Sequence, residues 1–222
     1  MSSELNAPSP RRGRPPAQHA GLLVERVLQV ATALFLERGF GRTTLDLVAQ
    51  QAKVGKSSLY ARYPSKGALF DAVVSHSIQA MFDHMTPVPQ QLSLAQRLQT
   101  VGERLIDGLL HPRCVALMRI TAAEAENFPD LALKAYQVSL EGSVEYVLMA
   151  MGATGLRGAR SNDAQLRDLA QRFVEVAVQP LSFQAAFGVE ADLLRLRATA
   201  CVQDAVALVK PQMTIILRRN AA

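Results

Sequence analysis

Apolar residues recur at spacings of three and four along nearly the whole chain, and this period constrains the fold more than any other feature of the sequence. Such a spacing places apolar side chains on one face of an α-helix. Leu23, Val27 and Val30 begin the first such run. Gly39 then predicts the end of that helix. Because no convincing strand pattern appears, we expect an all-α protein of about nine helices.

A pair of short helices is expected next. Thr43 is a candidate N-cap, because its hydroxyl can accept a hydrogen bond from the backbone N–H of Asp46, and that helix should run to about Gln51. A further short helix should run from Lys56 to Tyr63, where the following proline stops it. Two short helices joined by a tight turn predict a helix-turn-helix.

The rest of the chain continues the helical period. Ser65 can cap a helix that starts near Lys66, and Pro180 lies on a later apolar stripe as an expected kink. The predicted organisation is a disordered basic arm over residues 1–17, a helix-turn-helix domain over residues 18–70, and a larger helical domain over residues 71–222, whose role in ligand binding and dimerisation is implied only by the family resemblance described below.

Positive charge is concentrated in the first third of the chain. The whole sequence carries a net charge of +5, yet residues 1–70 hold ten Lys or Arg against four Asp or Glu, and residues 71–222 hold fourteen against fifteen. A basic segment beside a neutral one is typical of a protein that binds a polyanion. A solvated basic tail without a partner would show the same imbalance, so charge alone leaves both interpretations open.

The composition argues against several other classes of protein. The longest mostly apolar stretch, from Tyr146 to Leu156, falls well short of the ~20 residues that cross a bilayer, and the amino terminus lacks the apolar core of a secretory signal. We therefore expect a cytoplasmic protein with no membrane partner. Two distant cysteines, scattered histidines and the absence of nucleophile or phosphate-loop motifs predict no metal, no cofactor and no enzymatic activity.

The segment from Phe40 to Phe70 reads FGRTTLDLVAQQAKVGKSSLYARYPSKGALF. Its aromatic and Thr pair, the Ala and Val of its turn, and its Leu-Tyr, Pro-Ser-Lys and Leu-Phe pairs resemble the DNA-binding domain of the TetR family of bacterial transcriptional regulators. A weaker resemblance continues from Ile120 to Tyr136. The resemblance implies an all-helical homodimer with a DNA-binding amino-terminal domain, a ligand-binding carboxy-terminal domain and a dimer interface formed by the last two helices.

The second helix of a helix-turn-helix lies in the major groove of DNA with its first residues facing the base edges. We therefore expect Lys56, Ser57 and Ser58 to contact bases. Ala61, one turn further on, could touch a thymine methyl group. Taken alone, Lys56 and the two serines would more often be an ordinary solvated start of a helix, and the matched motif is what favours contact with bases.

The family resemblance implies further contacts to the DNA backbone. Thr44, Tyr60 and Lys66 match family positions that hold phosphates, which fix the position of the protein without reading sequence. Gly55 departs from the Ser or Thr often found at its position, so the recognition helix would lack a side-chain cap. Ala61 also replaces a larger residue, and both departures bear on which DNA sequence is read.

Arg11 to Pro15, RRGRP, is similar to the core of an AT-hook. In such an arm the glycine allows close approach to a narrow minor groove, and Arg12 and Arg14 would enter the negative potential of A·T tracts. A basic tail with no groove preference is the equally weighted alternative.

Candidate residues for a ligand and for a dimer lie in the carboxy-terminal helices. Flexible and aromatic side chains that could line an apolar cavity, although such residues more often form plain core, are Phe82, Met85, Met118, Tyr146 and Phe173. A small-residue stripe and two aromatics that could form a dimer interface are Ala198, Cys201, Ala205, Phe183 and Phe187.

The resulting interpretation is a ligand-responsive regulator, a repressor, whose partners are double-stranded DNA, a second copy of itself and a small apolar or amphipathic effector of unidentified structure. A dimer would read a palindromic operator if its recognition helices lie roughly 34–36 Å apart. The helix from Lys66 to about Met85 is the expected link between ligand and DNA. The alternatives are an architectural protein that binds DNA without sequence preference and a helical small-molecule carrier.

Overall fold

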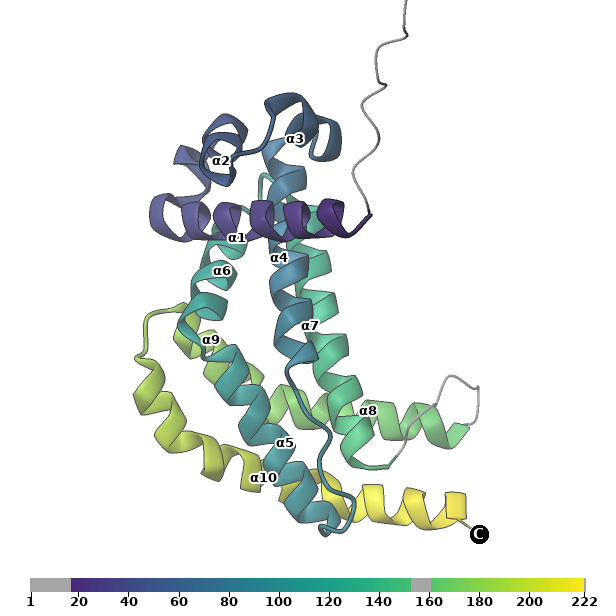
Figure 1. Ribbon diagram of the computed structural model, residues 1–222. Helices are drawn as coiled ribbons and strands as arrows, with labels where there is room; N and C mark the ends of the chain where they lie inside the picture. The colour runs from purple at the N-terminus through teal and green to yellow at the C-terminus, as the bar shows by residue number, and fades with distance from the viewer. Residues whose placement is uncertain (1–16, 153–160, 222) are drawn as a thin grey trace, which may run out of the picture.

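The computed structural model describes residues 17–152 and 161–221. These residues form helices and contain no strand, which confirms the all-α prediction. The helices are α1 (Ala17–Arg42), α2 (Leu45–Ala52), α3 (Lys56–Arg62), α4 (Lys66–Asp83), α5 (Leu94–Leu109), α6 (Pro112–Ala123), α7 (Pro129–Ala150), α8 (Ser161–Ala177), α9 (Gln179–Ala186) and α10 (Ala191–Ala221). Figure 1 shows α1, α2 and α3 at one end, α8 and α10 at the other, and α4 and α7 running between the two ends.

The predicted basic arm lies almost wholly outside the described residues. Of residues 1–17 only Ala17 is described, as the first residue of α1. Arg12 and Arg14 are therefore outside the described residues, and the predicted minor-groove contact stays a prediction.

An aromatic cluster holds the amino-terminal end together. The rings of Phe35, Phe40 and Phe70 are buried, with centroids 4.9 to 5.9 Å apart. Gly39 has a φ of +75°, which glycine adopts without the strain that a Cβ would bring, and it interrupts the helical geometry of α1. The helical geometry breaks at this glycine as expected, a short helical stretch continues to Arg42, and the chain then turns toward α2.

The prediction that Thr43 caps α2 is wrong. Thr44 is the N-cap, and its hydroxyl accepts a hydrogen bond from the N–H of Leu47 at 3.2 Å. Thr43 is fully buried, and the single proton of its hydroxyl is shared between the carbonyls of Gly39 at 2.9 Å and Leu34 at 3.2 Å. Which threonine meets the new helix depends on the turn after Gly39, and the residue pattern does not fix that turn.

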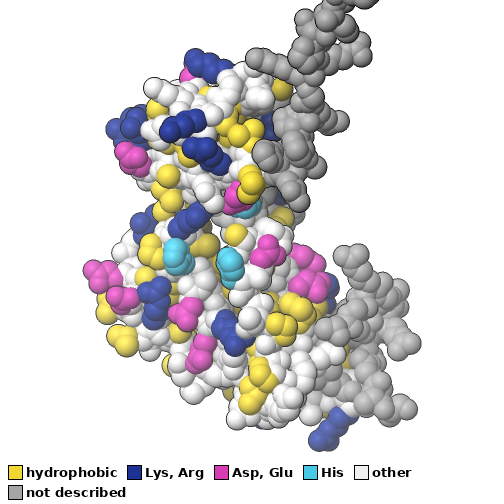
Figure 2. Space-filling view, viewed as in Figure 1, with side chains coloured by type: hydrophobic (Ala, Val, Ile, Leu, Met, Phe, Trp, Pro, Cys, Tyr) yellow, Lys and Arg dark blue, Asp and Glu magenta, His cyan; other side chains and the backbone are white. Residues whose placement is uncertain are grey.

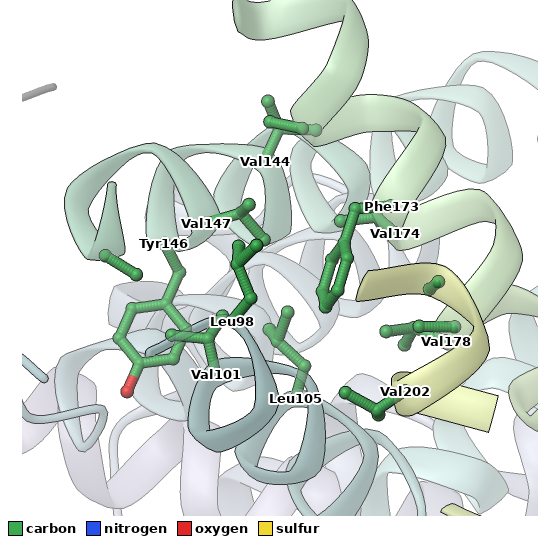
Figure 3. Close-up of a cluster of buried hydrophobic side chains, with 14 of the residues drawn as sticks. Leu98, Val101, Leu105, Val144, Tyr146, Val147, Phe173, Val174, Val178 and Val202 are labelled. Atoms are coloured by element: carbon green, nitrogen blue, oxygen red, sulfur yellow. The ribbon is translucent and has the colours of Figure 1, made fainter. Parts of the chain in front are cut away.

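The carboxy-terminal core lies where four helices meet. Side chains from α5, α7, α8 and α10 interleave around Phe173, which has no exposed surface (Figure 3). Leu98 and Leu105 of α5 face Val147 of α7 across this core, and Val202 of α10 closes it (Figure 3). α10 packs along both α8 and α5, so one face of this last helix is covered within the protomer.

The expected kink at Pro180 is a break between two helices. α8 ends at Ala177 and Pro180 lies in the first turn of α9, where its missing N–H costs no helical hydrogen bond. This division accounts for a tenth helix in the described residues where about nine were expected. None of the described helices combines the length and apolar character that a bilayer-spanning segment requires.

The two ends of the molecule share residues across the predicted boundary near residue 70. Leu117 of α6 and Leu131 of α7 are buried in the same cluster as Phe35 and Phe70, with Phe128 packed against it. α4 contributes to this cluster through its first half and reaches the carboxy-terminal core through Phe82. The division into domains at residue 70 stays a prediction, and the contacts show that the turn between α6 and α7 docks on the amino-terminal bundle.

Candidate functional site

α3 turns an apolar face toward the bundle and a polar face toward solvent. Leu59 is only 3% exposed and fixes the helix against the amino-terminal core. The five predicted DNA contacts on this helix are all exposed: Lys56, Ser57, Ser58, Tyr60 and Ala61. Figure 2 shows Lys and Arg side chains gathered over this end of the molecule, whereas acidic and basic side chains mix elsewhere on the same face.

The turn between α2 and α3 has the geometry that brings the two helices together. Lys53 adopts a left-handed conformation with φ of 54°, and its N–H bonds back to the carbonyls at the end of α2. The N–H of Val54 donates to the carbonyl of Ala49 at 3.0 Å, which closes the turn. Gly55 then begins α3 with no side-chain cap, as expected. The first N–H groups of α3 are therefore left without a side-chain acceptor from Gly55.

One carboxylate links α2 to two residues of the recognition helix. Asp46, in the first turn of α2, accepts a hydrogen bond from the Lys56 ammonium at 2.6 Å and one from the Tyr60 hydroxyl at 3.3 Å. The hydrogen bond from Lys56 lowers the pKa of the Asp46 carboxyl, and the same bond raises the pKa of the Lys56 ammonium. The side chains of Lys56 and Tyr60, both predicted to contact DNA, are thus hydrogen-bonded to the same carboxylate in this structure.

Lys66 has internal partners that its predicted role does not include. Its ammonium donates to the carbonyls of Phe40 at 2.9 Å and Gly41 at 3.1 Å, and it lies 4.3 Å from the centroid of the Phe40 ring. The side chain therefore ties the start of α4 to the end of α1. A phosphate contact would compete with these bonds, and we now expect Lys66 to act mainly on the fold.

Other charged groups at this end were missed from sequence. Arg62 at the end of α3 and Arg42 at the end of α1 are exposed cations. They become candidates for DNA contact only because the fold places them at the same end of the molecule as α3. The contact of Asp46 with Lys56 spans ten residues and depends on the left-handed turn at Lys53. An acidic residue in the first turn of a helix is a favourable charge that the sequence shows for Asp46, yet nothing in the residue spacing indicates its partner.

The chain matches two family models. The model of the tetR family of bacterial regulatory proteins covers residues 27–73, and the model of the AefR-like transcriptional repressor carboxy-terminal domain covers residues 96–209, which is more than half of the chain. The chain belongs to the TetR family of bacterial transcriptional regulators. The first model spans the helix-turn-helix of α2 and α3, so the exposed face of α3 belongs to the family's DNA-binding domain.

Two bacterial regulators are similar to less than half of this TetR-family chain. The HTH-type transcriptional regulator YdeS of Bacillus subtilis (strain 168) is 32% identical over 95 residues, which is 43% of this chain and 44% of YdeS. The biofilm operon icaADBC HTH-type negative transcriptional regulator IcaR of Staphylococcus aureus is 30% identical over 64 residues, 29% of this chain and 32% of IcaR. The matched region thus covers less than half of either relative.

Solved structures of the family share the fold over most of the chain. A TetR-family transcriptional regulator from Mesorhizobium loti MAFF303099 superposes with a TM-score of 0.68 at 21% sequence identity, covering 85% of this chain and 97% of the other. A TetR transcriptional regulator from Agrobacterium tumefaciens has a TM-score of 0.60 at 21% identity, covering 84% and 94% of the two chains. At these identities the similarity establishes the fold alone.

A groove of about 680 Å³ opens between α4, α7 and α8 of the regulator. Its apolar lining residues are Phe82, Val138, Leu140, Val144 and Met149, with Tyr146 beside them. Arg167 of α8 donates to Glu141 at 2.7 Å and to Glu145, both on α7. The hydrogen bond to Glu145 is the largest cause of a raised pKa of the Arg167 guanidinium, and the negative charges of Glu141 and Glu145 raise this pKa further. An apolar wall next to a charged trio suits an amphipathic molecule.

The predicted ligand residues do not form one site. Phe82 and Tyr146 line the groove, whereas Met85 and Met118 are half-buried and do not line it. Tyr146 itself is 2% exposed, and its hydroxyl donates to the carbonyl of Thr86 at 2.8 Å. The idea that Phe173 contacts a ligand needs correction, because its side chain is fully enclosed by the core helices. Spacing along one helix cannot distinguish a groove wall from a core position.

The small-residue stripe predicted for the dimer faces inward. Ala198 is 7% exposed and Ala205 is fully buried, because both pack against the protomer's own core, and Cys201 is half-buried. Ala198 and Ala205 are therefore not available as an interface, and that part of the prediction is corrected, whereas an interface contact by Cys201 stays a prediction. The two predicted aromatics are different: Phe183 is 65% exposed and Phe187 is 77% exposed, with ring centroids 4.6 Å apart.

α10 has a second, outer stripe that sequence reasoning missed. It consists of apolar residues that lie on one side of the helix, are exposed in the protomer and are interrupted by the exposed Arg197 and Asp204: Leu193, Ala200, Leu208, Pro211 and Ile215. We refer to these five residues as the outer α10 stripe. Within residues 17–152 and 161–221, no group of three or more His, Cys, Asp or Glu side chains has an arrangement that could hold a metal ion.

Proposed function

We propose that the protein is a dimeric transcriptional repressor that binds a palindromic DNA operator and releases it when a small amphipathic effector binds. The observation that carries the DNA-binding part is the exposed polar face of α3, with Lys56, Ser57 and Ser58 at its leading end and a buried Leu59 behind it. This face can enter a major groove while the rest of the bundle stays outside it. The excess positive charge of residues 1–70 supports binding to a polyanion.

The proposed dimer uses the end of the molecule opposite to α3. Phe183, Phe187 and the outer α10 stripe are exposed apolar groups, and α10 lies at that end of the molecule (Figure 1), while aromatic and aliphatic side chains of this kind are enriched at the centres of interfaces. A two-fold axis that runs along the direction from α10 to α3 would place two copies of α3 on the same side of the assembly. The two symmetry-related copies of α3 would then face the two half-sites of a palindromic DNA duplex.

The proposed effector site is the groove between α4, α7 and α8. α4 forms one wall of the groove and also carries Phe70 in the core of the DNA-binding bundle, so a ligand that displaces α4 would move that bundle. The groove offers apolar area from Val138 and Met149 and hydrogen-bonding capacity from the side chains around Arg167. We therefore expect an effector with a hydrophobic body and at least one polar group.

Repression is proposed because IcaR, one of the relatives, is described as a negative regulator, and because the carboxy-terminal family model describes repressors. A repressor works by occupying its operator, so the protein needs binding residues and no catalytic groups. We also propose that it acts in the cytoplasm, where bacterial DNA is accessible.

The test is selection of duplexes from a randomised DNA pool by the wild-type protein. We expect an enriched palindrome whose half-site centres lie roughly 34–36 Å apart. Lys56→Ala and Ser58→Ala should each weaken binding to that duplex by about tenfold or more. Glu37→Gln, an exposed change on α1, is the matched control and should retain the selected sequence.

Two results would contradict the proposal. Equal binding to the selected and scrambled duplexes would indicate an architectural protein without sequence preference. Absence of salt-dependent DNA binding would instead favour a helical small-molecule carrier.

A further inference from the structure

Asp46 occupies a position where a negative charge opposes DNA binding. It lies in the first turn of α2, its side chain is 51% exposed, and it contacts two residues of the helix that is proposed to enter the major groove. A phosphate backbone repels such a carboxylate and attracts the Lys56 ammonium that the carboxylate holds. The contact therefore reduces the general attraction between this face and DNA.

Stability does not account for the contact. The Lys56 side chain is 64% exposed, and ion pairs between exposed side chains contribute little to folding because solvent screens them and ordering two side chains costs entropy. Asp46 does not supply the N-cap of α2 either, because Thr44 does. What remains is the effect of Asp46 on the direction of the two side chains it binds.

Those side chains lie on one face of α3. Lys56 and Tyr60 are four residues apart, so they project from successive turns on the same side, and the single carboxylate of Asp46 meets both. The closed turn at Lys53 and the buried Leu59 fix α3 relative to α2. The carboxylate is therefore attached to a rigid frame, and the two donors are oriented by it.

We propose that Asp46 is a positioning residue that sets the sequence discrimination of the regulator by restraining Lys56 and Tyr60. A free lysine is a flexible point charge that can pair with any phosphate in reach. A lysine that gives one hydrogen bond to Asp46 keeps two donors in a limited range of directions, which suits the paired acceptors O6 and N7 of guanine. The inference depends on the proposed function, because discrimination has meaning only for a protein that reads sequence.

The experiment compares wild-type protein, Asp46→Asn and Glu37→Gln on two probes: the duplex selected by the wild-type protein and a scrambled duplex of the same composition. Asp46→Asn keeps the side-chain size and removes the charge. We expect it to bind the scrambled duplex about three- to tenfold more tightly, with a salt slope steeper by about 1, because the released Lys56 pairs with a phosphate. The ratio of specific to non-specific affinity should fall by about tenfold.

Glu37→Gln separates positioning from general electrostatics. It removes one exposed negative charge from the same bundle but frees no DNA-facing side chain, since its neighbour is Arg38. We expect it to leave the affinity ratio unchanged. Asp46→Glu, which keeps the carboxylate, should restore most of the ratio lost in Asp46→Asn. Thermal unfolding of each variant checks that the fold is intact.

A second measurement tests whether Asp46 acts through Lys56. In a Lys56→Gln background, Asp46→Asn should change the affinity ratio by much less than in the wild type. The inference is overturned if Asp46→Asn and Glu37→Gln change the ratio of specific to non-specific affinity equally, or if Asp46→Asn raises that ratio. It is also overturned if Asp46→Asn changes the ratio as much in the Lys56→Gln background as in the wild type. A wild-type protein that selects no sequence removes both this inference and the proposed function, whereas a selected sequence with an unchanged ratio removes only the inference.

Discussion

Neighbouring residues of the same type have different roles in this protein because of their surroundings. Thr43 and Thr44 are adjacent, yet the first is buried under the end of α1 and the second caps α2. Lys56 and Lys66 are both conspicuous cations of the DNA-binding bundle, yet one is paired with an exposed carboxylate and the other with backbone carbonyls. Side-chain chemistry limits the possible roles, and the local turn selects one of them.

Thr43→Val should destabilise the protein by about 1–3 kcal/mol, because the hydroxyl shares its proton between two carbonyls in a fully buried position and valine leaves them without that donor. Urea unfolding followed by circular dichroism measures the change. Thr44→Ser, at the next position, retains the capping oxygen and should be close to wild type. A valine variant as stable as the serine variant would contradict the role assigned to the buried hydroxyl.

Lys66→Met tests whether this lysine serves the fold or the DNA. We expect a loss of about 1–2 kcal/mol of stability, because the charged hydrogen bonds to Phe40 and Gly41 disappear while the apolar stem is retained. The salt dependence of DNA binding should stay the same, since no phosphate contact is removed. A slope shallower by about 1 at unchanged stability would instead support the phosphate contact implied by family resemblance.

At the scale of helices, α4 is joined to α7 and to the turn before it at three places. A Cβ on Gly67 of α4 would lie 2.7 Å from the ring of Phe128, and a Cβ on Gly142 of α7 would overlap the ring of Phe82. Between these contacts Asp71 pairs with Lys134 at 3.0 Å. α4 thus closely contacts α7 or the turn before it near both of its own ends, so we expect any motion of α4 to involve α7.

Gly142→Ala should destabilise the protein by about 1–3 kcal/mol, because the new methyl group meets the Phe82 ring and forces the two helices apart. Adding Phe82→Leu should recover part of that loss, and a double-mutant cycle on unfolding free energies measures the coupling. Gly21→Ala, with nothing within 4 Å of the added carbon, is the control and should not destabilise the helix. Additive effects of the two core changes would show that the contact is not as close as described.

The sequence predicts the helices well because their period and their breakers are local signals. Gly39 breaks the helical geometry of α1, and Pro64 and Ser65 end or begin helices as expected, since each acts through its own backbone or cap. The sequence fails where the outcome depends on a distant partner. Ala198 and Ala205 form a stripe that suits close helix packing, but only the fold shows that α8 and α5 already cover it.

The same limit applies to the candidate site. The exposed residues at the start of α3 follow from the helix-turn-helix pattern, because a recognition helix needs polar residues at its leading end. The link from Asp46 to Lys56 and the groove beside Arg167 each join residues from different helices. Contacts of this kind depend on helix crossings, and a pattern along one chain does not specify them.

At the scale of the whole molecule, the proposed dimer depends on which surfaces are already buried within the protomer. The inner face of α10 is covered by α5 and α8, whereas Leu208 is 57% exposed and Ile215 is 53% exposed on the outer α10 stripe. Exposed aliphatic side chains in a row on one helix favour association with another protein surface. A second copy is the partner that also supplies the second recognition helix.

Leu208→Asp should convert the dimer to a monomer at micromolar concentration, because burying a carboxylate in an apolar interface raises the dissociation constant by about 100-fold or more. Sedimentation velocity measures the mass, and the same variant should lose affinity for a palindromic duplex while it keeps weak binding to a half-site. Gln203→Asp introduces the same charge on another exposed part of α10 and serves as the control. If both variants stay dimeric, the interface lies elsewhere, and the two recognition helices need a different axis to reach successive major grooves.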